Sequence, residues 1–147
     1  IAGHRAAVGR GIEACKAKGA KRALLLPVSV PSHCALMQPA AERLRQRLAD
    51  VAINVPAIPV LHNADVASYA DAAQIRDALV RQLYSPVRWV ETVQAIAARG
   101  IAQIGECGPG KVLAGLGKRI TTDARTVALV DSAALAQFKT DLEGTAA

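Results

Sequence analysis

The residue best suited to proton-transfer chemistry is His33, which follows an apolar run ending at Val30. Ligands and catalytic groups of parallel α/β sheets gather where strands end, and a neutral imidazole there can act as a general base. Ser32 and Cys34 do not face His33 on regular structure, and the chain has no G-x-S-x-G elbow. His33 as a base therefore needs a nucleophile from elsewhere, and a purely structural histidine is the open alternative.

A second segment, Gly105 to Val112, nearly matches the phosphate-binding pattern G-x-x-x-x-G-K-[ST] between an expected strand and an expected helix. Two residues depart from it. Val112 has no hydroxyl for a magnesium ion, and Pro109 lacks the N–H that should donate to phosphate. The pattern favours a tight structural turn, with a nucleotide-binding loop as the alternative.

Positive charge is concentrated near the start of the chain. Six basic residues and one acid, Glu13, precede residue 23, so this part carries +5 of the formal net charge of +6. Such a segment can attract an acidic partner, and a solvated helix face is the simpler interpretation. The densest part consists of Lys16, Lys18, Lys21 and Arg22.

Composition excludes several classes of protein. With 52% hydrophobic and 20% charged residues in 147, the chain is expected to fold as one globular domain or a large piece of one. Aromatic residues make up only 3%, which argues against base stacking on nucleic acid. Apolar runs are far shorter than the roughly 20 residues of a membrane span, so we expect a cytoplasmic protein. Three scattered cysteines and three scattered histidines predict reduced thiols and no metal site.

Hydrophobic periodicity predicts alternating helices and strands, which indicates an α/β fold with a largely parallel sheet. Helices are expected over 4–18, 36–48, 75–83, 87–99, 111–120 and 133–142. Strands are expected over 22–30, 56–61, 101–105 and 126–130.

Three segments, in this order and at these separations, resemble the C-terminal half of bacterial malonyl-CoA:acyl carrier protein transacylase. They are Pro27 to Met37, Ile75 to Trp89 and Glu106 to Leu113. The resemblance implies part of an α/β-hydrolase-like large subdomain over 31–147, preceded over 1–30 by the end of a ferredoxin-like small subdomain. It implies transfer of a malonyl group from coenzyme A to the phosphopantetheine thiol of acyl carrier protein, in fatty acid biosynthesis, through an acyl-serine.

The resemblance also assigns roles to residues. His33 falls on the family's general base and Gln82 on the glutamine whose backbone carbonyl orients that base. The family's glycine-proline-glycine turn falls on Gly108 to Gly110, in line with the structural interpretation of the loop. Acyl carrier proteins are acidic, so the four basic residues Lys16, Lys18, Lys21 and Arg22 are candidates for carrier docking.

Several parts of the family's site do not occur in this chain. In the family these parts lie upstream: the nucleophilic serine, the arginine that holds the malonyl carboxylate, and the glutamine-rich N-terminal loop that helps to make the oxyanion hole. We therefore expect a fragment, inactive alone, whose partners are acyl carrier protein, malonyl-CoA as substrate, and a missing N-terminal half, with no bound cofactor. The alternative is a non-catalytic nucleotide- or RNA-binding α/β module.

Overall fold

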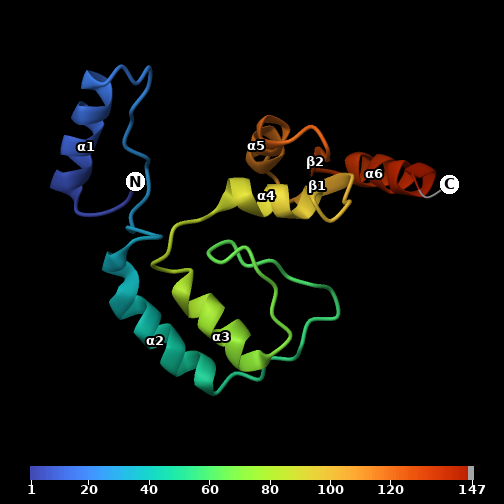
Figure 1. Cartoon of the computed structure of the whole chain (residues 1–147), viewed down its shortest axis with the longest axis horizontal. Coiled ribbons are helices and arrows are strands. Elements are labelled where there is room, and N and C mark those ends of the chain that lie inside the picture. The colour runs from blue at the N-terminus through green and yellow to red at the C-terminus, as the bar shows by residue number, and fades with distance from the viewer. Residues whose placement is uncertain (146–147) are drawn as a thin grey trace. The chain divides into compact units, whose positions relative to one another are not determined.

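A computed structural model describes residues 1–145. Two compact units make up this part of the chain, one over residues 1–88 and the other from residue 89 onward. The first unit contains three helices and one 3-10 turn, and the second contains three helices and two strands (Figure 1). This mixed α/β content confirms the expected class. The expected boundary between residues 30 and 31 falls inside the first unit and stays a prediction.

The elements of the first unit agree with the predicted helices. They are α1 (Arg5–Ala17), the 3-10 turn η1 (Ala35–Met37), α2 (Gln38–Ala49) and α3 (Ala72–Arg81). α3 begins three residues earlier than expected because Asp71 caps it, accepting hydrogen bonds from the backbone N–H groups of Ala73 and Gln74, both at 3.0 Å. The sequence carries a signal for this start, an aspartate followed three residues later by Gln74.

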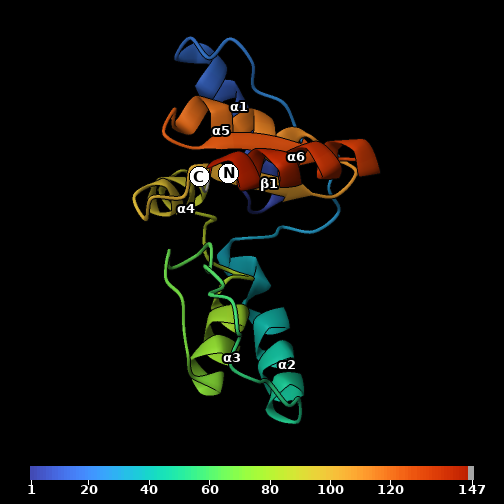
Figure 2. The same ribbon diagram turned by 90° about the vertical axis from the view of Figure 1, so that its right-hand side faces the viewer.

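α2 and α3 lie side by side in both views (Figures 1 and 2) and form the core of the first unit. Ala41 on α2 and Ala78 on α3 are buried, and small side chains allow two helices to approach closely. Arg76 ties the pair together at the end of α2. Its guanidinium donates to the carbonyl oxygens of Leu48, at 3.0 Å, and Val51, at 2.8 Å. The first bond adds a donor to a carbonyl in the last turn of α2, and the second holds the chain just beyond that helix.

Both strands predicted for the first unit are wrong, because residues 22–30 and 56–61 have no regular secondary structure. A strand needs a neighbour to pair with its backbone groups, and neither segment pairs with a strand within the described residues. Prolines also interrupt both runs. At Pro27 the Val28 N–H bonds to the Leu26 carbonyl at 2.8 Å, which turns the chain, and Pro56 and Pro59 remove two donors from the second run.

The second unit is a parallel strand pair with helices on both sides, as the alternating pattern predicted. Its elements are α4 (Trp89–Ala97), β1 (Gln103–Cys107), α5 (Val112–Ile120), β2 (Arg125–Leu129) and α6 (Ser132–Thr145). β1 and β2 pair from Gln103 opposite Arg125 to Cys107 opposite Leu129. α5 and α6 both pack on β2, and the strands lie between these two helices (Figure 1).

The contact between α5 and β2 requires a glycine at one position. A Cβ on Gly117 would lie 2.4 Å from Thr126 Oγ1 and 3.0 Å from Thr126 Cβ, too close for real atoms. Thr126 is 4% exposed and β-branched, so its side chain has little room to move away. Gly115 on the same helix is exposed, and a Cβ there would meet nothing within 4 Å.

We therefore expect Gly117→Ala to lower the free energy of unfolding by about 1–3 kcal/mol, the usual cost of overpacking. The control Gly115→Ala should raise the free energy of unfolding by about 0.5–1 kcal/mol, since alanine stabilises an exposed position inside a helix more than glycine does. Urea unfolding of the two variants beside the unsubstituted protein measures both changes. Equal effects of the two substitutions would mean that α5 and β2 do not approach as closely as described.

Candidate active site

His33 lies in the turn that leads into η1 and α2, and its backbone is in the left-handed region with φ 63°. Few non-glycine residues adopt this conformation, and those that do are usually held there by their surroundings. Two bonds to the end of α3 hold His33. Its N–H donates to the Leu83 carbonyl at 2.9 Å, and its ring Nδ1 lies 2.9 Å from the Gln82 carbonyl oxygen.

The second of these bonds sets the state of the imidazole. A backbone carbonyl can only accept, so Nδ1 must carry the hydrogen and Nε2 of the neutral ring must be unprotonated. His33 is exposed, which leaves Nε2 open to a reacting group. This is the arrangement of a general base whose orientation is set by its other nitrogen.

The two carbonyls are available because α3 ends just before them. α3 stops at Arg81, and the N–H groups of Tyr84 and Ser85 turn back to the Arg81 carbonyl at 3.2 and 3.0 Å. The carbonyls of Gln82 and Leu83 are thereby free to accept from His33. The donors of His33 and the carbonyls at the end of α3 are therefore each other's hydrogen-bond partners, although His33 and Gln82 are 49 positions apart in sequence.

The other sequence candidates lie apart from this pair. Lys16 belongs to the last turn of α1, where it forms an ion pair with Glu13 at 2.9 Å, and Lys18, Lys21 and Arg22 follow the helix. All four are exposed. Across residues 1–145, no carboxylate pairs with Lys18, Lys21 or Arg22, so three of the four charges are available to a partner.

The glycine-rich loop of the second unit already has an anion at its helix. The Glu106 carboxylate accepts from the N–H groups of Leu113, at 3.2 Å, and Ala114, at 2.7 Å, at the start of α5. A phosphate would need these same donors. The loop therefore carries its own capping carboxylate, in line with the structural interpretation of the turn.

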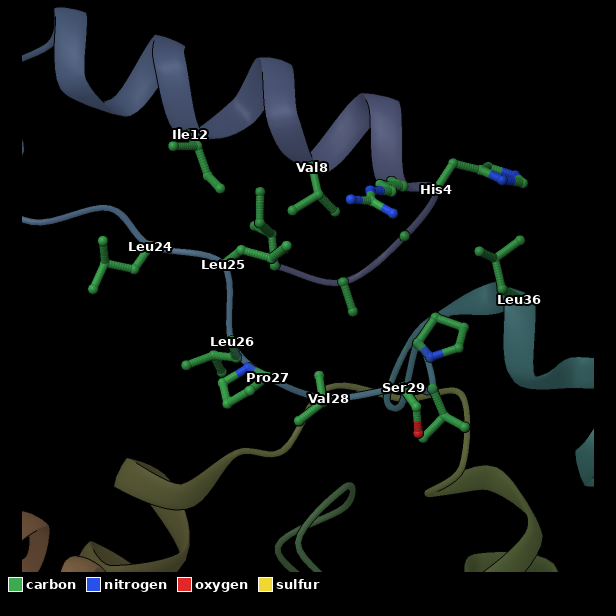
Figure 3. A pocket seen from close by; sticks show the side chains of 16 residues that line it. His4, Val8, Ile12, Leu24, Leu25, Leu26, Pro27, Val28, Ser29 and Leu36 are labelled. Atoms are coloured by element: carbon green, nitrogen blue, oxygen red, sulfur yellow. The ribbon is translucent and has the colours of Figure 1, made fainter.

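A cavity of about 870 Å³ in the first unit lies between α1 and the segment from Leu24 to Pro31 (Figure 3), and His33 is not among the residues that line it. Val8 and Ile12 point from α1 toward this segment. Its walls are mostly apolar, and Leu24, Leu25 and Leu26 are each more than 60% exposed. The cavity therefore offers mainly apolar surface, with His4, Arg5 and Ser29 as its polar lining.

In the described part of the chain, no three metal-ligating side chains come together, and no helix is long and apolar enough to cross a membrane. All three cysteines, Cys15, Cys34 and Cys107, are free thiols.

The fold and the site define an α/β chain with an exposed histidine of fixed orientation, and comparisons with known proteins narrow this class of protein. No family model matches the chain. It is 58% identical, over 135 residues, to the malonyl CoA-acyl carrier protein transacylase of Salmonella typhimurium, covering 92% of this chain and 44% of the relative. The chain thus spans less than half the length of the curated relatives that it matches.

Two solved structures agree with this match. The acyl-carrier-protein S-malonyltransferase of Burkholderia pseudomallei superposes with a TM-score of 0.89 at 51% identity, over 93% of this chain and 45% of that one. A malonyl-transacylase in complex with its type II PKS acyl-carrier protein gives a TM-score of 0.91 at 51% identity, over 95% of this chain and 45% of that one. The chain corresponds to the C-terminal half of malonyl CoA-acyl carrier protein transacylases, which confirms the resemblance found in the sequence.

The geometry makes a spectroscopic prediction about His33. Its ring should be the Nδ1–H tautomer when neutral, opposite to the Nε2–H form that free histidine prefers. ¹⁵N NMR of the imidazole nitrogens distinguishes the two forms, and His4, which makes no capping bond to α1, serves as the internal control. A neutral His33 with its hydrogen on Nε2 is incompatible with the bond to Gln82.

Proposed function

We propose that this chain supplies the general base of a malonyl transfer from coenzyme A to the phosphopantetheine thiol of acyl carrier protein. The observation that carries the proposal is the bond from His33 Nδ1 to the Gln82 carbonyl, which leaves an exposed Nε2 free to accept a proton. The 58% identity to the Salmonella typhimurium transacylase supports the choice of reaction. In this proposal the nucleophilic serine comes from the part of the relatives' sequence that this chain does not match.

In the proposed reaction His33 accepts one proton and gives it back in each of two half-reactions. Nε2 takes the proton of the serine hydroxyl as its oxygen attacks the malonyl thioester, and returns it to the departing coenzyme A thiolate. In the second half Nε2 takes the proton of the carrier thiol, whose sulfur attacks the acyl-serine, and returns it to the serine oxygen. Gln82 acts through its carbonyl, which stabilises the imidazolium formed in each half.

The same proposal covers the architecture. Residues 31–147 would complete an α/β-hydrolase-like subdomain, and residues 1–30 would end a ferredoxin-like one. The exposed apolar segment around Leu24 to Leu26 supports this, because side chains of this size are normally covered. The proposed cover is the N-terminal half of the enzyme, with malonyl-CoA entering only as substrate and the reaction taking place in the cytoplasm.

The test uses a chimera in which this chain replaces the matching C-terminal half of the Salmonella typhimurium transacylase. His33→Ala in the chimera should lower the turnover number for malonyl transfer by a factor of about 100 to 10,000, the range for losing a general base. Gln82→Ala should have a smaller effect, because the proposed role belongs to the backbone carbonyl. The turnover numbers of the unsubstituted chimera and of the two variants are measured as transfer of radiolabelled malonyl groups to carrier protein.

Two outcomes would contradict the proposal. One is a His33→Ala chimera with near-normal turnover, and the other is an unsubstituted chimera that is folded by circular dichroism yet transfers nothing. His4→Ala is the matched control, since it removes an imidazole from the same unit without touching α3, and it should leave turnover unchanged.

We also propose that Lys16, Lys18, Lys21 and Arg22 attract the acidic carrier protein. Their exposure, and the absence of a carboxylate partner for the last three among residues 1–145, support this. Exposed charges act mainly on the rate of encounter, and salt weakens them because the screening length is about 10 Å near 0.1 M.

Replacing Lys18, Lys21 and Arg22 with Gln in the chimera should raise the KM for carrier protein by about 3- to 10-fold at low salt and flatten its salt dependence. Lys16→Gln is the control, because Lys16 is already paired with Glu13, and it should change KM less. Steady-state kinetics at several salt concentrations measures both. An equal rise in the KM for malonyl-CoA would mean that these basic residues bind the phosphates of coenzyme A, and it would exclude carrier docking.

A further inference from the structure

The loop between α2 and α3 contains a tight turn over residues 62–67 that the proposed chemistry does not use. His62 is 6% exposed, and its N–H donates to the Ala67 carbonyl at 2.9 Å. Val66 donates to the His62 carbonyl at 2.8 Å and has φ 57°, in the left-handed region. A β-branched residue adopts this conformation only when its surroundings require it. The turn is therefore a defined structure within a long loop.

An ion pair joins this turn to the end of α3. The Asp65 carboxylate, with a side chain only 16% exposed, accepts from the Tyr69 hydroxyl at 3.0 Å and from Arg81 Nη1. Arg81 Nε donates to Asp77 Oδ2 at 2.6 Å, one turn earlier on α3. The guanidinium is thus held on two sides, and its neighbour in sequence is Gln82.

The charge state of this pair is constant over the range in which a histidine titrates. The hydrogen bond from Arg81 is the largest influence on Asp65 and, against the opposing effect of burial, it holds the pKa of that carboxyl below its ordinary 3.8. Since the folded pKa is depressed, the pair stabilises the fold fully above the ordinary value, and this contribution is lost only as pH falls through the folded pKa.

The same turn holds the far end of the segment. The Asn63 carbonyl accepts from the Arg88 N–H at 2.9 Å. The stretch between Arg81 and Arg88 is therefore tied to the turn at both ends, by a side-chain pair at its start and a backbone bond at its close. This stretch contains the Gln82 and Leu83 carbonyls that hold His33.

We propose that Asp65 and Arg81 are positioning residues for His33, acting through the carbonyls of Gln82 and Leu83. Neither side chain touches the imidazole. Their ion pair holds the end of α3 against the 62–67 turn, which keeps the Gln82 carbonyl in line with Nδ1 and so keeps Nε2 aimed outward. This inference rests on the proposed role of His33 as the base.

A different result is expected if the Asp65–Arg81 ion pair only stabilises the fold. Loss of such a pair would lower stability without changing the turnover of the molecules that remain folded. Loss of a positioning pair changes the chemical step itself, because a displacement of about 1 Å in a reacting group can cost up to about 100-fold in rate. Binding of malonyl-CoA does not depend on the imidazole tautomer, so its KM should stay constant.

The test is Asp65→Asn in the chimera, which keeps the side-chain shape and removes the charge. We expect the turnover number per folded molecule to fall about 10- to 100-fold and the KM for malonyl-CoA to change less than about 2-fold. Arg81→Lys, which retains one cation, should recover part of the loss seen with Arg81→Gln. Arg45→Gln is the matched control. Arg45 lies on α2 and pairs at 3.4 Å with Asp77 of α3, so its loss removes an ion pair from the same helix as Arg81 without touching the turn. It should leave turnover within about 2-fold of the unsubstituted chimera.

A double-mutant cycle separates the two roles. In a His33→Ala background, Asp65→Asn should cause no further fall in turnover, because the group that it positions is gone. ¹⁵N NMR of the single variant should show His33 losing its fixed Nδ1–H form. Tyr69→Phe, which removes one bond to Asp65, is the milder variant if Asp65→Asn does not fold, and it should lower turnover about 2- to 5-fold.

Unchanged turnover in a folded Asp65→Asn chimera would overturn the inference. If that variant does not fold, unchanged turnover in Tyr69→Phe would overturn it instead. A further fall in turnover when Asp65→Asn is added to His33→Ala would also overturn it. These results leave the proposed function intact, provided that His33→Ala alone lowers turnover by the expected factor of about 100 to 10,000. A His33→Ala chimera with normal turnover would instead remove the proposed function itself.

Discussion

The candidate site of the first unit depends on one hydrogen bond, from His33 Nδ1 to the Gln82 carbonyl at 2.9 Å. A helix ends with carbonyls that lack partners, and a left-handed residue needs external support. Each of these requirements is met by the other, with the His33 N–H also bonded to Leu83. The pairing selects one tautomer of the imidazole and one orientation of the ring. An exposed side chain that would otherwise sample several rotamers thereby acquires a defined direction.

The second unit satisfies the same physical requirement at the opposite end of a helix. The Glu106 carboxylate accepts from two N–H groups at the start of α5, at 3.2 and 2.7 Å. A negative charge is stabilised there by the helix dipole, so the glycine-rich loop serves packing between β1 and α5. The helix then lies so close to β2 that Gly117 has no room for a Cβ beside Thr126. Backbone donors that could hold a phosphate are used within the fold.

Residues 22–30 show how a segment can be apolar without being buried. Leu24, Leu25 and Leu26 are each more than 60% exposed, and they border the cavity under α1. The chain covers about 44% of the length of the Salmonella typhimurium relative. Within the described residues this segment pairs with no strand, so its apolar side chains have no sheet to be buried in.

The sequence by itself determined the helices, because apolar periodicity, Pro39 in the first turn of α2 and Gly19 after α1 are local signals. It also determined the parallel pair of β1 and β2 and, through resemblance, the family. Only the tertiary structure decided that residues 22–30 and 56–61 are not strands, because pairing depends on a distant neighbour. The resemblance had already paired His33 with the Gln82 carbonyl, and the tertiary structure added the geometry of that bond, 2.9 Å from Nδ1. Only the tertiary structure joined Asp65 to Arg81, because two side chains 16 positions apart in a loop and a helix leave no periodic signal in the sequence.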